Sequence, residues 1–519
     1  MRKFNVTGNC VPNMHYMVDI SEKVEQIFQM VEGAKYFTIN RGRQYGKTTT
    51  IGRLKKRLID EGSYICASIS FQYSNDKMFE NEGSFCQGLL SRINRSLMME
   101  NKEEALLWLD DSVTDFWKLS KFISKRCKEK KIVLIINEVD EAANYNLFVR
   151  FLQLLREKFQ MRTASRDYTF HSVILVSVRD VKNLDYVSGD TVRSSPWNIA
   201  SNFDIDMSFS APEIETILIE YENDHHTGMD ISEIANEIRF YTNGYPYLVS
   251  RICQFIDTDL DRNWTIDGVQ DAIKMILKEN SAFFAEMFNI IEENEDFRNL
   301  LFDLTFANIY LSYNPHDPVS KTGLMYSYLG KQGYKLAVHN KIFEIRITNY
   351  FIVTNLRKWR ETNLILTPVS EIVKDGIFNM ELCLTRFNSF YSEIYTAKDL
   401  KFLERDGKLI FLTYLKPLIN GFGFYHFESE TRDFGRMDLV VDFLKQQFII
   451  ELKLWYGSSK HEDAYDQLAN YLKSKNMECG YLITYDFRKK RDPLLHETQW
   501  VNWKGKRIFD VILRVGEEE

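Results

Sequence analysis

The feature that most constrains the fold lies near the N-terminus, where a short apolar run, a glycine-containing loop and an amphipathic run follow one another. The residues YFTIN (36–40) have the composition of a short buried strand. The next residues, RGRQYGKTTTIGRLKKRLI (41–59), pass from a loop into an amphipathic helix. A strand joined to a helix in this way is a βα unit, and repeated βα units build open, largely parallel sheets. We therefore expect residues 36 to about 205, where strands and helices alternate, to form an α/β core.

The loop carries a motif whose residues are suited to binding phosphate. Its GKTTT core (46–50) matches the end of the P-loop pattern GxxxxGK(S/T). Loop N–H groups and the helix N-terminus attract phosphate anions, and we expect Lys47 to reach the β and γ phosphates and Thr48 to bind Mg²⁺. The leading glycine of the pattern is replaced by Arg41, with Gly42 one place late, and a larger residue at that position constrains the loop backbone.

A second strand of such a core should end in acidic residues near the Mg²⁺. KIVLIINEVDEA (131–142) supplies that strand, but its tip is Asn137-Glu138 where Asp-Glu is usual. Asn137 can accept a hydrogen bond from a metal-bound water but carries no charge, whereas Glu138 stands where a water-polarising glutamate would. Asp140, farther into the loop, is an alternative ligand, so we expect nucleotide binding with slow hydrolysis. The predicted nucleotide-binding residues are Gly46, Lys47, Thr48, Thr49 and Asn137, with Glu138 in a catalytic role and ATP as the ligand.

Other segments are candidates for contact with the nucleotide. MVDI (17–20) is a candidate wall of an adenine pocket, with core packing as the alternative. GYP (244–246) is a candidate contact to the base, with plain helix initiation as the alternative, because proline suits a first helical turn. Ser177 and Arg179, at the end of the apolar run VILVSVRD (173–180), are candidates for sensing the γ-phosphate.

Near the C-terminus, two apolar runs carry charged residues at positions that could share one face of a sheet. GRMDLVV (435–441) begins its run at Asp438, and FIIELK (448–453) ends in Glu451 and Lys453. Alternate strand residues share a face, so Glu451 and Lys453 point the same way. If the two strands pair through a turn at residues 445–447, Asp438 joins them. Two carboxylates and an ammonium can hold a divalent metal and orient a water for phosphodiester attack; a simple cross-strand ion pair is the alternative.

The segment that follows favours the metal site. EDAYDQLANYLKSK (462–475) has a helical pattern, with Gln467 and Tyr471 one turn apart on one face. A strand Asp, a strand Glu-x-Lys and a helix Gln-xxx-Tyr together resemble the PD-(D/E)XK nuclease superfamily in its RecB-like branch, over about residues 396–515. GYLITYDF (480–487) then corresponds to the next core strand.

This resemblance implies a role for each matching residue. Asp438 and Glu451 would bind Mg²⁺ or Mn²⁺, and Lys453 would position the attacking water or stabilise charge on the phosphate. Gln467 and Tyr471 would support the site or contact the nucleic-acid backbone.

Taken together, the two motifs resemble a bacterial family in which an AAA-type ATPase-like module is fused to a PD-(D/E)XK nuclease-like domain. The resemblance extends to stretches such as NGYPYLVSRIC (243–253). We therefore expect an α/β multidomain protein with a P-loop AAA-type parallel sheet. The expected parts are a P-loop ATPase-like core (1–205), a helical lid (206–275), a winged-helix-like module (276–365), a linker (366–395) and a nuclease-like domain (396–519).

Length and composition agree with this organisation. The chain has 519 residues, enough for several domains, and a formal net charge of −7, which argues against non-specific DNA binding by the whole surface. No apolar stretch is long enough to span a bilayer, the first residues lack the apolar core of a signal peptide, and the seven cysteines form no CxxC pair. We expect a cytoplasmic protein without membrane contact.

Two classes of function follow. The first is a metal-dependent nuclease whose activity is gated by nucleotide binding. The second is a nucleotide-binding switch or scaffold whose nuclease-like domain binds nucleic acid or a protein partner without cleaving it. The expected partner is nucleic acid, with DNA favoured over RNA, and a homo-oligomer is left open.

Overall fold

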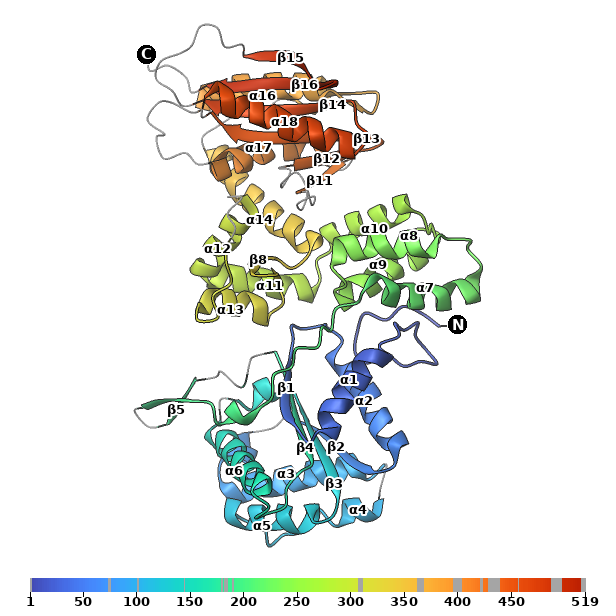
Figure 1. The fold of residues 1–519 in the computed structure, drawn as a ribbon, viewed down its shortest axis with the longest axis vertical. Coiled ribbons are helices and arrows are strands. Elements are labelled where there is room, and N and C mark those ends of the chain that lie inside the picture. The colour runs from blue at the N-terminus through green and yellow to red at the C-terminus, as the bar shows by residue number, and fades with distance from the viewer. Residues whose placement is uncertain are drawn as a thin grey trace. The chain divides into compact units, whose positions relative to one another are not determined.

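The chain divides into two compact units, whose helices and strands are labelled in Figure 1. The N-terminal unit comprises Met1–Ile276 and Lys321–Leu329, and the C-terminal unit comprises Leu277–Ser320 and Gly330–Glu519. The computed structural model describes residues 2–72, 76–99, 102–143, 145–178, 181, 185–188, 191–306, 311–361, 368–394, 404–420, 423–427, 439–455, 457–486 and 497–514.

The N-terminal unit is built on a four-stranded parallel sheet, as the sequence predicts. Its strand order is β1-β4-β3-β2. Both faces of β3 are covered, and residues 132–136 are wholly buried, which is why this strand is a continuous apolar run. The strands are β1 (Tyr36–Asn40), β2 (Tyr64–Ser70), β3 (Lys131–Asn137) and β4 (Ser172–Ser177).

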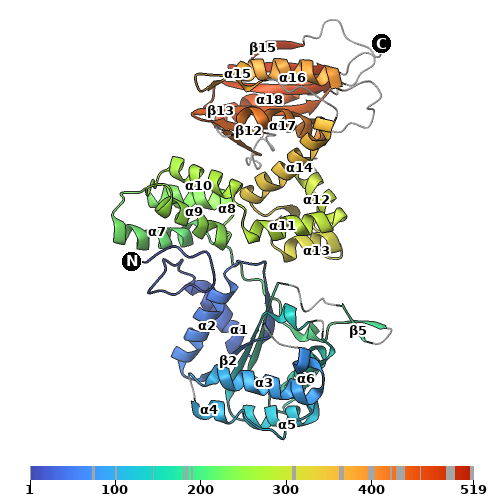
Figure 2. The same cartoon turned by 180° about the vertical axis from the view of Figure 1, so that it is seen from behind.

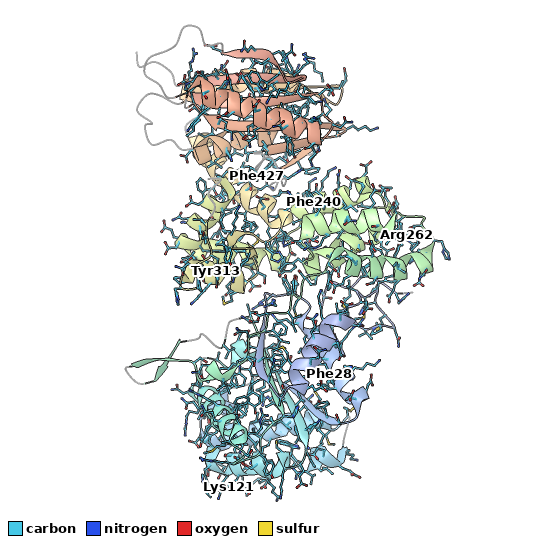
Figure 3. The ribbon with its side chains drawn as sticks, in the orientation of Figure 1. Phe28, Lys121, Phe240, Arg262, Tyr313 and Phe427 are labelled. Atoms are coloured by element: carbon cyan, nitrogen blue, oxygen red, sulfur yellow. The ribbon has the colours of Figure 1, made fainter. Side chains whose placement is uncertain are left out.

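Helices surround this sheet, and side chains fill the space between the layers (Figure 3). Phe28, for example, is buried on α1, and the guanidinium carbon of Arg57 on α2 lies 4.0 Å from its ring centre. The helices of the core are α1 (Ser21–Glu32), α2 (Lys47–Glu61), α3 (Glu82–Leu97), α4 (Lys102–Leu106), α5 (Phe116–Cys127) and α6 (Asn146–Thr163). A hairpin of β5 (Asp185–Ser188) and β6 (Thr191–Ser194) follows β4.

A bundle of helices follows the core and forms the lid that the sequence predicts. Its first helix begins at a capping box, in which the Ser210 side chain accepts from the N–H of Glu213 and the Glu213 side chain accepts from the N–H of Ser210. The lid helices are α7 (Ala211–His225), α8 (Ile231–Thr242), α9 (Pro246–Thr258) and α10 (Ile266–Lys278).

The C-terminal unit begins with helices and a short hairpin. This region corresponds to the expected winged-helix-like module, an assignment that stays a prediction. Its elements are α11 (Ala282–Glu293), α12 (Glu295–Phe306), α13 (Pro318–Met325), β7 (Leu329–Gln332), β8 (Lys335–Val338) and α14 (Lys341–Glu361). The end of α13 and the residues up to Leu329 pack within the N-terminal unit.

A six-stranded mixed sheet forms the rest of the C-terminal unit, in the order β11-β12-β13-β14-β16-β15. The strands β11, β12 and β13 are antiparallel, β13, β14 and β16 are parallel, and β15 is antiparallel to β16. The strands are β11 (Gly423–His426), β12 (Leu439–Phe443), β13 (Gln446–Leu454), β14 (Cys479–Asp486), β15 (Thr498–Trp503) and β16 (Lys506–Arg514).

Helices cover both faces of this sheet. Helix α18 (Ser458–Ser474) lies in front of it in Figure 1, and α16 (Met380–Ile394) lies in front of it in the opposite view of Figure 2. Helix α17 (Glu404–Ile419) packs in the same apolar core as α16. The predicted linker at 366–395 therefore contributes a helix to this core, after the small elements α15 (Val369–Ile372), β9 (Val373–Lys374) and β10 (Ile377–Phe378).

Searched over the described residues, no helix combines the length and the apolar composition that crossing a bilayer requires.

Candidate functional sites

A loop of residues 41–46, which we call the phosphate loop, connects β1 to the start of α2. Gly46 precedes the first helical residue with a φ of 76°, in the left-handed region that glycine adopts without strain. The helical hydrogen bonds of α2 begin with Thr50, whose N–H donates to the carbonyl of Gly46. The N–H groups of the preceding turn have no partner within the helix, so they form a site for anions.

The side chain of Lys47 lies inside the phosphate loop. Its Nζ donates to the carbonyl oxygen of Arg41 at 2.5 Å and to that of Gly42 at 3.0 Å. Burial lowers the pKa of Lys47 to about 8, and the carboxylates of Asp140 and Glu138 oppose that shift. Because burial disfavours the charged form of this lysine, a polyanionic ligand such as a phosphate chain would stabilise its ammonium.

The tip of β3 differs in detail from what the sequence predicts. The side chain of Asn137 donates from Nδ2 to Ser68 Oγ at 3.0 Å and to the carbonyl oxygen of Ile69 at 3.2 Å, so it ties β3 to β2. The exposed Glu138 has a φ of 54° and accepts from Ser70 Oγ at 2.7 Å. Both groups have structural partners here, and their predicted roles toward Mg²⁺ and water stay predictions.

Asp140 connects this tip to the neighbouring strand end. Its Oδ2 accepts from the N–H of Val178, just beyond β4, at 2.7 Å. The charges of Asp140 and Glu138 both raise the pKa of Lys47 against the effect of burial. Two carboxylates and the exposed Thr48 therefore supply oxygen atoms of the kind that Mg²⁺ prefers.

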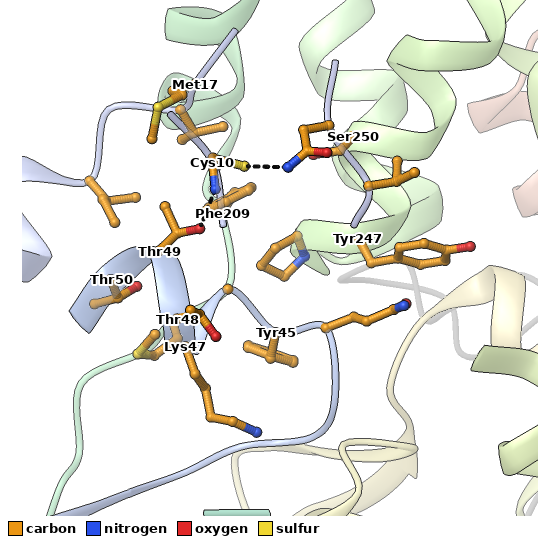
Figure 4. Close-up of a pocket in the computed structure, with 18 of the residues that line it drawn as sticks. Cys10, Met17, Tyr45, Lys47, Thr48, Thr49, Thr50, Phe209, Tyr247 and Ser250 are labelled. Carbon is orange, nitrogen blue, oxygen red and sulfur yellow. Dashed lines mark hydrogen bonds between the residues drawn. The ribbon is translucent and has the colours of Figure 1, made fainter. Parts of the chain in front are cut away.

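A cavity of about 250 Å³ lies beside the start of α2 (Figure 4). The phosphate loop and the first turn of α2 line one part of it, including Lys47, Thr48 and Thr49. The remaining wall is mostly apolar, with Met17, Val18 and Ile20 from before α1, Met207 and Phe209 from before α7, and Pro246 and Tyr247 from α9. The segment MVDI and the GYP turn thus both contribute to one cavity. A phosphate-binding loop beside an apolar cavity is the arrangement a mononucleotide requires.

Several residues that hold this site could not be found from the sequence. The N–H of Cys10 donates to Thr49 Oγ1 at 3.3 Å, which places the N-terminal segment against α2. The hydroxyl of Tyr245 donates to the carbonyl oxygen of Arg43 at 2.6 Å and links the lid to the phosphate loop. These contacts join residues far apart in the chain, and no local pattern signals them.

Of the two candidate sensors of the γ-phosphate, the structure describes only Ser177. Ser177 is buried at the end of β4, and its carbonyl oxygen accepts from the N–H of Arg41 at 3.4 Å. Arg179 lies outside the described residues. Arg41, which replaces the leading glycine of the motif, also donates from its guanidinium to the carbonyl oxygen of Ile205 at 2.8 Å, so this larger residue anchors the loop to the segment before the lid.

The charged residues of β13 form the second candidate site. Glu451 is wholly buried, and its Oε1 lies 2.6 Å from Nζ of Lys453, whose side chain is 29% exposed. The turn between β12 and β13 is at Leu444 and Lys445, one residue earlier than predicted, because Gln446 already pairs with Phe443. Asp438 lies outside the described residues. Within the described part of the chain, no group of three His, Cys, Asp or Glu residues is placed to hold a metal ion.

Helix α18 covers the face of the sheet that carries these residues. Tyr471 is buried in the core formed by this helix and the sheet, and Gln467 is half-buried. Helix α18 also carries His461 and Tyr465, and the sequence did not indicate their contacts with Asp510. The Nε2 of His461 lies 2.8 Å from Oδ2 of Asp510, and the hydroxyl of Tyr465 donates to the same oxygen at 2.6 Å. Asp510 is wholly buried on β16, and it fixes the first turns of α18 against the sheet.

Comparison with known proteins agrees with the N-terminal architecture. Residues 14–266 match the sequence model of a family described as an AAA-like domain. The chain is also similar to an uncharacterized WD repeat-containing protein of Synechocystis sp., with 20% identity over 266 residues that cover 50% of this chain and 21% of that protein. The chain thus spans about a fifth of the length of the curated relative that it matches.

The chain also has a distant similarity to solved structures. The Walker-type ATPase of Pyrococcus abyssi is 10% identical, with a TM-score of 0.44 over 66% of this chain and 99% of its own. Cdc6p from Pyrobaculum aerophilum is 14% identical, with a TM-score of 0.33 over 63% of this chain and 93% of its own.

The parallel sheet, the phosphate loop and the helical lid define a nucleotide-binding protein of the P-loop class. Within that class, residues 14–266 form an AAA-like P-loop ATPase domain. The mixed sheet of the C-terminal unit is an α/β domain to which the comparisons assign no type.

Proposed function

We propose that the N-terminal unit binds ATP with Mg²⁺ and hydrolyses it slowly. The observation that carries this proposal is the position of Lys47, whose half-buried side chain places its ammonium among loop carbonyls at the N-terminus of α2, beside an apolar cavity. Phosphates would be bound by the N–H groups of the first turn of α2 and by Lys47, and the base would occupy the apolar cavity. Bound Mg²⁺ would neutralise phosphate charge, with Thr48, Glu138 and Asp140 as its candidate ligands.

We further propose that the C-terminal sheet is a nuclease-like domain. The order of its elements supports this: helix α17, the antiparallel strands β11 to β13, the crossover helix α18, and β14 parallel to β13. Glu451 and Lys453 lie at the end of β13, where that resemblance places the metal ligand and the water-positioning lysine. Asp438 would be the second ligand, Gln467 and Tyr471 would support the site, and a bound Mg²⁺ or Mn²⁺ would act as a Lewis acid on the phosphate.

In this proposal, nucleotide binding gates phosphodiester cleavage, the substrate is nucleic acid with DNA favoured over RNA, and the protein acts in the cytoplasm. The experiment is a cleavage assay on mixed DNA and RNA substrates with Mg²⁺ or Mn²⁺, with and without ATP. We expect products that depend on the metal and change with ATP, and none from Glu451→Gln, which removes the ligand charge at nearly constant volume. Cleavage that survives Glu451→Gln would contradict this site.

A second candidate function is a nucleotide-binding switch without cleavage. Two observations favour it: the amide of Asn137 donates to Ser68 and Ile69, and the buried Glu451 forms an ion pair with the partly exposed Lys453. For this function, the same assay should show no cleavage of any substrate while ATP still binds. ATP-dependent capture of labelled DNA by the intact protein would then support a binding role.

A further inference from the structure

The phosphate loop is contacted from outside by a segment that neither its motif nor the AAA-like match includes. This segment, Lys321–Leu329, is part of the N-terminal unit, although the chain on either side of it belongs to the C-terminal unit. We call it the docking segment. Its Ser327 is buried, and Ser327 Oγ accepts a hydrogen bond from the N–H of Gly42 at 3.1 Å.

The packing at this contact explains why a glycine occupies position 42. A Cβ atom built on Gly42 would lie 2.4 Å from the carbonyl oxygen of Tyr326 and 3.1 Å from Cβ of Ser327. The first distance is shorter than real Cβ contacts, and its partner is a backbone atom that cannot turn away. The glycine that stands one place late in the motif is therefore required by the docking segment.

Gly42 also links the docking segment to the phosphate site. Its N–H donates to Ser327, while its carbonyl oxygen accepts from Nζ of Lys47 at 3.0 Å. The conformation of Ser327 is itself unusual, since its φ is 59° although it is not a glycine. A non-glycine residue keeps such a conformation only where its surroundings hold it.

We propose that Ser327 is a positioning residue of the phosphate loop, and that docking of Lys321–Leu329 and nucleotide binding stabilise each other. Ser327 orients Gly42, and Gly42 holds the ammonium of Lys47 where a phosphate would meet it. By thermodynamic linkage, a contact that favours nucleotide binding is favoured by the nucleotide to the same degree. This inference rests on the proposed ATP binding.

The test is Ser327→Gly, which removes the hydroxyl and leaves a residue that tolerates a φ of 59°. Isothermal titration should show ATP affinity reduced about fivefold to tenfold, the lower part of the usual coupling range. The unfolding temperature should stay close to that of the natural protein, which separates loss of positioning from loss of fold. Ser320→Ala is the matched control. Ser320 lies on α13 and is buried, as Ser327 is, but its hydroxyl donates to Asp317 and not to the phosphate loop.

The reciprocal measurement is hydrogen exchange of the docking segment in the full chain. ATP should slow exchange of residues 321–329 in the natural protein and in Ser320→Ala, and should slow it much less in Ser327→Gly. Equal ATP affinities for Ser327→Gly and the natural protein would overturn the inference and leave the proposed ATP binding intact. A natural protein that binds no ATP would overturn both.

Discussion

Lys47 Nζ donates to the carbonyl oxygen of Arg41 at 2.5 Å, across the phosphate loop that separates the two residues. The loop therefore surrounds the side chain of Lys47, the first residue of α2, and holds its ammonium at the site where a phosphate is expected. This preorganisation has a cost, because the ammonium loses hydration that carbonyl groups replace only in part.

A pH dependence follows from that cost. Burial lowers the pKa of Lys47 to about 8 from its usual 10.5, and phosphate should favour the protonated form. ATP binding above pH 8 should therefore take up a proton, and affinity should fall by up to about tenfold per pH unit above pH 8. Titrations in buffers of different ionisation enthalpy measure the uptake; binding without uptake at pH 9 would refute this.

The same shift predicts a stability change without nucleotide. Unfolded protein keeps the Lys47 proton up to about pH 10.5, whereas folded protein releases it near pH 8, so the unfolded state binds more protons in that window. The contribution of Lys47 to the free energy of unfolding should therefore rise between pH 8 and 10.5. The rise should be absent in Lys47→Met, as denaturant titrations at several pH values would show.

Gly42→Ala should damage the site more than Gly52→Ala, a change on the neighbouring helix α2. Its methyl group would press on the carbonyl oxygen of Tyr326, so the loop or the docking segment must shift. We expect a loss of about 1–3 kcal/mol in the free energy of unfolding, typical of overpacking, together with weaker ATP binding. Gly52→Ala is the control, since a Cβ at Gly52 meets nothing closer than 3.8 Å and alanine favours the helix. Equal stability of the two variants would contradict the packing argument.

Asn137→Asp should have two opposite effects. The aspartate adds a negative charge at the strand tip, where it can balance the charge of Mg²⁺. The rate of phosphate release per folded molecule should therefore rise from a slow basal value. It also removes the two hydrogen bonds donated to Ser68 and Ile69, which should lower the free energy of unfolding by about 1–3 kcal/mol. Brisk turnover by the natural protein, lost on Glu138→Gln and unchanged by Asn137→Asp, would show that another group such as Asp140 holds the metal.

Asp510 should be a costly carboxylate to remove from the C-terminal unit. Asp510→Ala leaves His461 and Tyr465 without their buried acceptor, and burial together with Asp510 keeps the pKa of Tyr465 well above its usual value. We expect a loss of about 2–5 kcal/mol. Glu478→Ala, which removes an exposed ion pair with Lys506, should change the free energy of unfolding by less than about 1 kcal/mol. Thermal unfolding of the two variants compares them directly.

The sequence predicted the strands β1, β3, β4, β12, β13 and β14 because their signals are local, but it did not single out β2, β11, β15 or β16. The buried runs of β1, β3 and β4 and the GKTTT loop each lie within a few consecutive residues, and their placement follows from periodicity. The hairpin turn at Leu444 was misplaced by one residue, since periodicity fixes faces better than ends.

What the sequence did not predict depends on tertiary contacts. Ser327 and Gly42 are 285 residues apart, and nothing near either residue signals the other. His461 and Asp510 meet because β16 happens to lie beside β14, an order that local pattern does not specify. The stretch 366–395 was expected to be a linker, but it contains α16, whose apolar residues pack in the core of the C-terminal sheet. The role of this helix in the core depends on contacts with the sheet, which the local sequence does not specify.

The most direct test of the account is isothermal titration of ATP with Mg²⁺ into the natural protein and into Lys47→Ala at pH 7. We expect one binding site per chain in the natural protein and an affinity at least about tenfold lower in the variant, because the ammonium no longer offsets phosphate charge in the loop. Equal affinities in two folded proteins would contradict it, since the phosphate site would then lie elsewhere than in the loop that surrounds Lys47.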